Sequence, residues 1–144
     1  MVNGFFASLL VNDYQKSQAK MELQIPRTGW NDMIIFVADD RQFQIDLIGC
    51  QLSSAGYRVI GCRSGEETVD KMNSQIVDML ITDMEMGVMT GEHVLEYVRE
   101  EFGSLPVVLT SGNPNNLKRE GFDGYLEKPF SMEELLTVVE NARK

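Results

Sequence analysis

Six side chains that can do chemistry stand at the ends of short apolar runs in this sequence: Asp39, Asp40, Asp83, Thr110, Ser111 and Lys128. Crowded carboxylates repel one another, so a folded protein must neutralise them with a metal ion, by protonation or with a cation. Mg²⁺ suits a small set of hard oxygen ligands, because it keeps several waters and completes its shell with phosphate oxygens. If the fold gathers these residues, they predict a Mg²⁺ site with room for a phosphate.

Asp83 is the natural nucleophile of such a site. It stands alone at the end of the run MLIT, and the loop MEMGVMTG follows it. With Mg²⁺ and Lys128 shielding an anionic donor, its carboxylate could attack phosphorus and form an aspartyl phosphate. Ser111 could donate a hydrogen bond to the phosphoryl group, and Lys128 could pair with it. Thr110 is the weaker candidate, because neighbours on a strand point to opposite faces and its side chain should pack under a helix.

The apolar runs are expected to be strands of one sheet. They cover residues 33–38, 57–60, 77–82, 107–111 and 125–128, and segments of helical period lie between them. Five alternations predict an α/β fold of the (βα)5 type, because parallel neighbours need right-handed crossover connections. Ligands of such doubly wound parallel sheets lie outside the carboxyl ends of the strands. The chemical side chains should therefore meet along one edge of the sheet.

Helical spacing and capping signals predict where the helices lie. The first helix carries one stripe of side chains on a single face: Phe43, Leu47, Cys50 and Ser54. Capping boxes that begin at Ser64 and Ser131 start two further helices, and an apolar stripe predicts another over residues 91–102. The stretch 112–124 has room for only a turn or two of helix, so the fourth helix should be short.

Composition excludes several classes of function. A chain of 144 residues with 43% hydrophobic residues suits one globular domain, which can bury roughly two thirds of its unfolded surface. Its 13 basic and 22 acidic side chains give a formal charge of −9, so we expect no direct binding to nucleic acid or to a membrane. No segment has the pattern of a targeting signal or a membrane span. Cys50 and Cys62 are expected to be reduced core residues of a cytoplasmic protein.

Four motifs together resemble those of two-component response regulator receiver domains, which have the CheY-like fold. VADD matches the acidic pair, DMEMGVMTG resembles the phosphorylation loop, LPVVLTSG resembles the strand with the switch hydroxyl, and GYLEKPF completes the set. All four occur in the order that the family has. The resemblance implies a flavodoxin-like sheet with strand order 2-1-3-4-5, a receiver domain over residues 33–144 and an N-terminal extension over residues 1–32.

The resemblance also implies roles for the acidic residues. Asp83 would accept a phosphoryl group from a histidine kinase or phosphotransfer protein. Mg²⁺ would be held by Asp39, Asp40 and Asp83, with the main-chain carbonyl of Glu85 as a further ligand. Such a domain is a signalling phosphoacceptor and not an enzyme, so only self-phosphorylation and self-dephosphorylation are expected.

The same resemblance implies a switch. Ser111 and Lys128 would contact the phosphoryl group, and Lys128 would precede a cis peptide at Pro129. Tyr125 would be the aromatic residue that rotates inward when Ser111 moves. Phosphorylation adds about −1.5 to −2 charges, which would change the binding of a downstream protein partner or the formation of a homodimer.

Three features depart from the family pattern. Gly87 takes the place of a usual proline, so the loop should be less rigid, and Arg41 follows the acidic pair, where it would partly offset the negative charge. The short fourth helix changes the usual output face. We therefore expect partner recognition to use another face of the domain.

Two other functions fit parts of the pattern. A Mg²⁺-dependent phosphatase of the haloacid-dehalogenase type also forms an aspartyl phosphate, but it needs a second aspartate where this chain has Glu85, and it needs a cap insertion. A receiver-like interaction module would bind partners without taking phosphate. Residues 1–32 fit either a short amphipathic helix, suited to a dimer contact, or a disordered extension.

Overall fold

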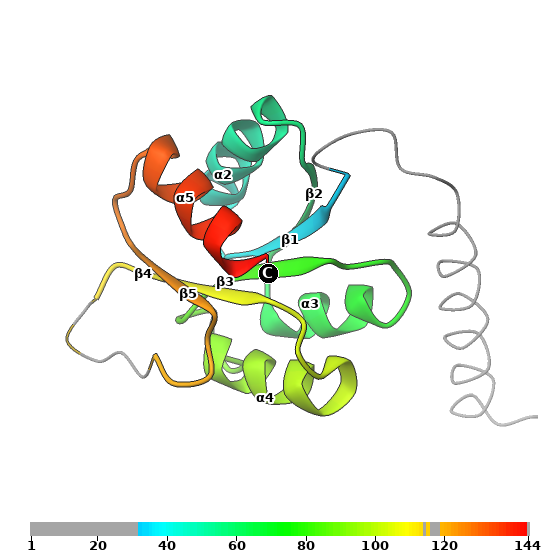
Figure 1. The fold of residues 1–144 in the computed structure, drawn as a ribbon. Helices are drawn as coiled ribbons and strands as arrows, with labels where there is room; N and C mark the ends of the chain where they lie inside the picture. Colours follow the sequence, from blue (N-terminus) through cyan, green and yellow to red (C-terminus); the bar gives the residue numbers. More distant parts are fainter. Residues whose placement is uncertain (1–31, 114, 116–118, 144) are drawn as a thin grey trace, which may run out of the picture.

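The computed structural model of the protein describes residues 32–113, 115 and 119–143 (Figure 1). The elements of these ranges are β1 (Ile34–Ala38), α2 (Gln42–Ser54), β2 (Arg58–Cys62), α3 (Gly65–Met72), β3 (Met79–Asp83), α4 (Gly91–Phe102), β4 (Val107–Ser111), β5 (Gly124–Glu127) and α5 (Met132–Ala142). The two alternatives for the N-terminal extension concern residues 1–32, and residues 1–31 of it lie outside the described residues.

The five strands are parallel and lie in the order β2-β1-β3-β4-β5, which confirms the predicted doubly wound sheet. Helices α2 and α5 cover one face, and α3 and α4 cover the other (Figure 1). Strands β1, β3 and β4 are buried at every position, and accordingly β1 is apolar throughout and β3 and β4 are apolar up to their last two residues. The strand order reverses between β1 and β3, so the carboxyl ends of these two strands flank the usual ligand position.

Two hydrophobic clusters hold the helices on the sheet. The cluster under α2 and α5 includes Ile35, Val37, Ile48, Leu52, Leu135 and Val139. The cluster under α3 and α4 includes Phe36, Met72, Leu80, Val94 and Val98. Each large apolar side chain contributes about 1.5–3 kcal/mol when fully buried. This packing holds the helices on the sheet and, with the hydrogen bonds between the strands, keeps the strand ends in fixed relative positions.

The face of α2 that packs on the sheet is not the predicted one, which carries Phe43 and Leu47. Its buried residues are Ile45, Ile48 and Leu52. Phe43 and Leu47 are 62% and 45% exposed. Both sets have helical spacing, so spacing alone could not choose between them. Ile45 settles the choice, because it packs on Gly61 of β2, where an added Cβ would lie 2.6 Å from the Ile45 Cγ2 atom.

Most predicted boundaries agree with the structure to within two residues. Cys62 is buried at the end of β2 as predicted, but Cys50 lies on the solvent side of α2, so its prediction as a core residue was wrong. The described residues between β4 and β5 contain no α-helix. The predicted short fourth helix falls partly on residues 114 and 116–118, which lie outside the described ranges.

The predicted capping signals are formed in different degrees. The box that begins at Ser131 is complete. At Ser64 the hydroxyl accepts a hydrogen bond from the Glu67 amide, but the Glu67 carboxylate does not return to the Ser64 amide and bonds elsewhere. A further box, which we did not predict, joins Thr90 and His93 at the start of α4. His93 is therefore a helix-capping residue.

Arg99 fastens the carboxyl end of α4 to the chain segments that precede β4 and β5. Its guanidinium donates hydrogen bonds to the carbonyl oxygens of Gly103, Leu105 and Gly121. It also pairs with Asp123 at 2.9 Å, and the same carboxylate oxygen accepts from the Val107 amide. These contacts fix the start of β5, although the described residues between β4 and β5 contain no α-helix.

Replacing Gly91 with alanine should destabilise the domain by about 1–3 kcal/mol, because an overpacked site forces the backbone to shift. A Cβ at this position would lie 2.5 Å from the carbonyl oxygen of Asp83, and the Gly91 amide donates to Met84 at 2.9 Å. Urea denaturation measures the change. Gly49→Ala in α2 is the matched control, because its Cβ would meet only Val59 at 3.6 Å. Equal midpoints for both variants would contradict the prediction.

Candidate functional site

The carboxyl ends of β1, β3, β4 and β5 surround a cleft of about 450 Å³. It is lined by Asp40, Arg41, Asp83, Glu85, Gly87, Ser111, Gly112, Asn113 and Lys128. Asp39 is buried directly after β1 and reaches Lys128 beside the cleft. Thr110 is buried and does not line the cleft, as its position on the strand predicted. Five of the six side chains thus come together.

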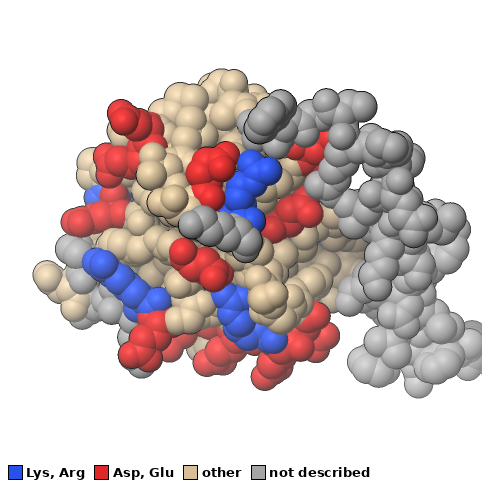
Figure 2. Space-filling view, in the orientation of Figure 1, with Lys and Arg blue, Asp and Glu red and all other residues tan. Residues whose placement is uncertain are grey.

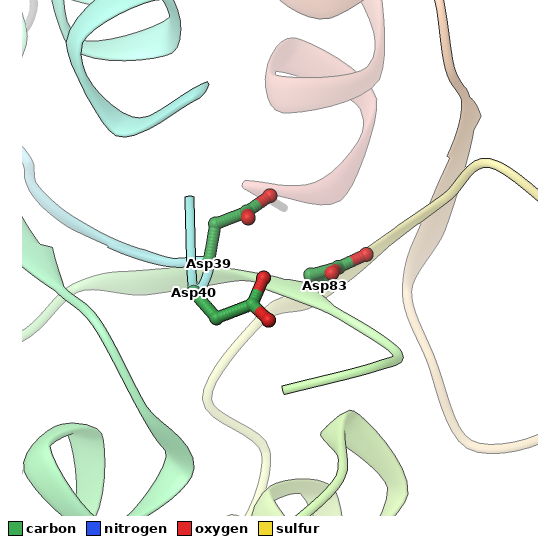
Figure 3. Close-up of side chains that lie close together, drawn as sticks. All are labelled: Asp39, Asp40 and Asp83. Atoms are coloured by element: carbon green, nitrogen blue, oxygen red, sulfur yellow. The ribbon is translucent and has the colours of Figure 1, made fainter. Parts of the chain in front are cut away.

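Three carboxylates face a common space at this edge (Figure 3). Asp39, Asp40 and Asp83 each offer one oxygen, and these oxygens lie within 4.8 Å of one another. Asp39 and Asp83 are buried, whereas Asp40 is exposed. Few, hard oxygen donors with an open side are what Mg²⁺ requires, because it keeps waters and accepts phosphate oxygens. The donor set therefore fits the predicted ion.

Lys128 pairs with two of these carboxylates. Its Nζ lies 2.7 Å from Asp39 Oδ2 and 3.3 Å from Asp83 Oδ1. Its amide donates to the Ser111 carbonyl at 2.8 Å, which ties the end of β5 to β4, and its peptide bond to Pro129 is cis. Asp39 is only 1% exposed, so a carboxylate there needs a paired cation.

Burial raises the pKa of the Asp83 carboxyl from 3.8 to about 6. Lys128 opposes this shift, and the nearby charges of Asp39 and Asp40 add to it. The ionised form is the one that can attack phosphorus, and in this cleft it is disfavoured by its surroundings. A divalent cation among the carboxylates would favour it, so the electrostatics of the cleft also support cation binding.

We expect Mg²⁺ to stabilise the protein more at about pH 8 than at about pH 5, because metal ligands must be deprotonated. With the pKa of Asp83 at about 6, protons compete with the ion at the lower pH. When the free Mg²⁺ concentration is ten times the Kd, the free energy of unfolding should increase by about 1.4 kcal/mol. Urea denaturation in MgCl2 and in EDTA measures it, and Asp40→Asn should remove most of the effect. Equal stabilisation at both pH values would contradict the prediction.

Ser111 is held by the loop that follows β4. Its hydroxyl accepts from the Asn113 amide at 3.1 Å and donates to the Asn113 carbonyl at 3.3 Å. A ligand that engages this hydroxyl must therefore compete with these two bonds. Sequence reasoning missed Asn113, although its place just beyond the end of a site strand was a signal that could have found it.

Tyr125 of β5 is packed under Arg119, whose guanidinium carbon lies 3.9 Å from the ring centroid. Its hydroxyl is buried and has no hydrogen-bond partner among the described residues. A buried, unsatisfied hydroxyl costs about 1–3 kcal/mol. A ring position that gave this hydroxyl a partner would therefore be favoured. Arg119 was also missed, because stacking across a loop leaves no periodic pattern in the sequence.

The sheet order and the acidic cleft at its switch point define a CheY-like α/β domain, and solved structures agree. The chemotaxis protein CheY4 of Vibrio cholerae is similar with a TM-score of 0.72 and 25% identity, covering 77% of this chain and 98% of that one. The response regulator TrrA of Thermotoga maritima, solved in complex with Mg²⁺ and BeF, has a TM-score of 0.71 and 26% identity, covering 76% and 98%.

The response regulator receiver domain model matches residues 35–140, and the chain belongs to that family. The sensor histidine kinase TmoS of Ectopseudomonas mendocina is 33% identical over 75% of this chain. The autoinducer 1 sensor kinase/phosphatase LuxN of Vibrio campbellii is 26% identical over 90% of it. This chain spans only 12% of the length of TmoS and 16% of the length of LuxN.

Receiver domains are signalling phosphoacceptor domains that bind Mg²⁺ at an acidic pocket, and this chain has a cluster of three aspartates at the carboxyl edge of its sheet. The relatives are histidine kinases and response regulators of two-component systems. In the part of the chain that the structure describes, no helix has the length and apolar character needed to cross a bilayer.

Proposed function

We propose that this domain accepts a phosphoryl group on Asp83 from the phosphohistidine of a kinase or phosphotransfer protein, and that phosphorylation changes partner binding. The observation that carries the proposal is the position of the Asp83 carboxylate. It lies at the end of β3, 3.3 Å from the Lys128 ammonium, in a cleft that Ser111 also lines. A carboxylate, a hydroxyl and an ammonium around one open space can bind and accept a phosphoryl group.

In the transfer step, an oxygen of the Asp83 carboxylate attacks phosphorus. The new O–P bond forms as the bond from phosphorus to the histidine nitrogen breaks, and its electron pair stays on that nitrogen. Lys128 remains beside the reacting carboxylate and pairs with a phosphoryl oxygen. When bound by the three aspartates and the carbonyl of Glu85, Mg²⁺ supplies positive charge that offsets the phosphoryl oxygens.

The switch in this proposal begins at Ser111. Its hydroxyl gives up its hydrogen bonds with the Asn113 backbone and donates a hydrogen bond to a phosphoryl oxygen instead. The loop after β4 loses these two contacts and is released. Charge-assisted hydrogen bonds contribute about 1.5–3 kcal/mol each. Two of them, to Ser111 and Lys128, approach the roughly 5.5 kcal/mol that a shift from 1:99 to 99:1 requires. Tyr125, with its unsatisfied hydroxyl, follows the movement of Ser111.

The wider assignments form part of the same proposal. Residues 33–144 are the receiver domain and 1–32 an extension, and the setting is cytoplasmic, with a kinase or phosphotransfer donor and a downstream protein or a second copy as partner. Direct nucleic-acid or membrane binding is not expected at a formal charge of −9. On the face drawn in Figure 2, Lys and Arg of the described residues are interspersed with Asp and Glu and form no continuous basic patch.

Incubation with acetyl phosphate and Mg²⁺ tests the proposal against its alternatives. A stable phosphate adduct that peptide mapping places on Asp83 supports the receiver function. Rapid multiple turnover of phosphate esters would instead indicate the phosphatase, in which Glu85 would have to serve as acid and base. Partner binding without any adduct would indicate the interaction module.

A further inference from the structure

One cation of the cleft has no part in the transfer step. Arg41 lines the cleft beside Asp40, Asp83 and Glu85. Its amide donates to Asp39 Oδ1 at 3.0 Å, which fixes the residue at the rim, and it is the N-cap of α2 without giving a side-chain cap. Its side chain is exposed, and within the described ranges no ion pair engages its guanidinium. The guanidinium is therefore available to a ligand of the cleft.

The other charges around the cleft make this cation significant. Lys128 is engaged by Asp39 and Asp83, so of the described cations that line the cleft Arg41 is the one without a carboxylate partner. Asp40 and Glu85 are both exposed at the cleft. They repel an incoming anion, and the charges at the mouth of a cleft govern how fast charged ligands enter it.

We propose that Arg41 is a specificity-determining residue for small acyl phosphates as phosphoryl donors. This inference rests on the proposed transfer to Asp83. An acyl phosphate enters as a dianion, the Asp83 oxygen bonds to phosphorus, and the P–O bond to the acyl group breaks with its electron pair on the departing carboxylate. A guanidinium at the rim attracts the dianion and pairs with the carboxylate that leaves.

Donors with a P–N bond place a smaller demand on Arg41. Phosphoramidate enters with less negative charge, and its protonated nitrogen leaves as neutral ammonia when the P–N bond breaks. Phosphohistidine whose second ring nitrogen is protonated likewise releases a neutral imidazole. Arg41 should therefore speed phosphorylation by acyl phosphates more than phosphorylation by a phosphohistidine of a protein donor.

The test compares labelling rates of Asp83 by acetyl phosphate and by phosphoramidate in the full chain with Mg²⁺. Arg41→Gln should lower the second-order rate constant for acetyl phosphate by about 5-fold, a moderate effect for a screened charge at a cleft. The rate with phosphoramidate should change by less than about 2-fold, and Arg41→Lys should restore most of the acetyl phosphate rate. The difference between donors should shrink as salt is added.

Arg63→Gln is the matched control. It removes the same charge from a neighbouring exposed position, where the guanidinium donates to the Asp40 carbonyl at 3.2 Å and does not line the cleft. We expect it to leave the ratio of the two rates unchanged. If Arg41→Gln slowed labelling by both donors equally, or if Arg63→Gln changed the ratio of the two rates by the same amount, the proposal for Arg41 would be overturned. The proposed phosphoryl transfer to Asp83 would still stand. If neither donor labels the unsubstituted protein, the proposed function fails as well.

Discussion

The substitution Asp83→Asn should abolish phosphoryl acceptance from protein and small-molecule donors alike. It keeps the shape of the buried side chain but removes the nucleophilic oxygen, and loss of a nucleophile lowers rates by about 1,000-fold or more. Intact-mass measurement after incubation with acetyl phosphate and Mg²⁺ reads out the adduct. Asp70→Asn, at an exposed position of α3, is the matched control and should be labelled like the unsubstituted protein. Labelling of the Asp83→Asn variant at a normal rate would place the acceptor elsewhere.

The same variant should be more stable than the unsubstituted protein when no metal is present. The pKa of Asp83 is raised from 3.8 to about 6 in the folded state. Proton binding therefore stabilises the folded state, and this stabilisation is complete below the unfolded-state pKa of 3.8. It is lost as the pH rises through the folded-state pKa of about 6. Asparagine stays neutral at every pH. A pKa difference of one between the folded and unfolded states corresponds to about 1.4 kcal/mol, so the gain in EDTA should approach about 3 kcal/mol above pH 7 and vanish near pH 4. A gain that does not depend on pH would contradict this origin.

The substitution Lys128→Met should produce the second large effect, a loss of about 3–5 kcal/mol of stability without metal, because it leaves a buried charge unpaired. Asp39 is 1% exposed and the Lys128 side chain 13% exposed, so little water reaches the pair. Urea denaturation in EDTA measures the loss. Addition of Mg²⁺ should recover part of it, since the ion would neutralise the same carboxylates.

Lys71→Met provides the comparison for this variant. Lys71 pairs with Glu67 at 2.9 Å, but the two side chains are 32% and 37% exposed. Exposed pairs contribute about 0–1 kcal/mol, so this change should be small and should not respond to Mg²⁺. If both lysine variants lost the same stability, burial of the Asp39 pair would not be the cause.

The sheet and its acidic edge were predictable because their physical cause is local in the chain. Strands buried on both faces are predominantly apolar, and the polar residues that end each apolar run mark the carboxyl end of the strand. Asp83 and Ser111 each end a strand, and Lys128 follows one directly. Parallel connection then brings these ends together without any knowledge of side-chain contacts.

The features that sequence reasoning missed depend on contacts between distant segments. Helix α2 has apolar residues at helical spacing on both sides, and only the fit of Ile45 on Gly61 selects the buried one. The stacking of Arg119 on Tyr125 follows from how the chain enters β5, which no spacing rule describes. The bonds of Ser111 to Asn113 join a side chain to a loop backbone, so residue type alone did not predict them.

Helix α4 extends from the carboxyl-terminal edge of the sheet to its amino-terminal edge. The amide of its first residue donates a hydrogen bond to the carbonyl oxygen of Met84, directly after Asp83. Arg99, near its other end, binds the segments that precede β4 and β5. Its 12 residues form a rod about 18 Å long. A movement of the acceptor loop would therefore act on a helix that reaches the amino-terminal edge of the sheet. If this helix moves as a rigid body, a protein bound at that remote edge would respond to the state of Asp83 without approaching the cleft.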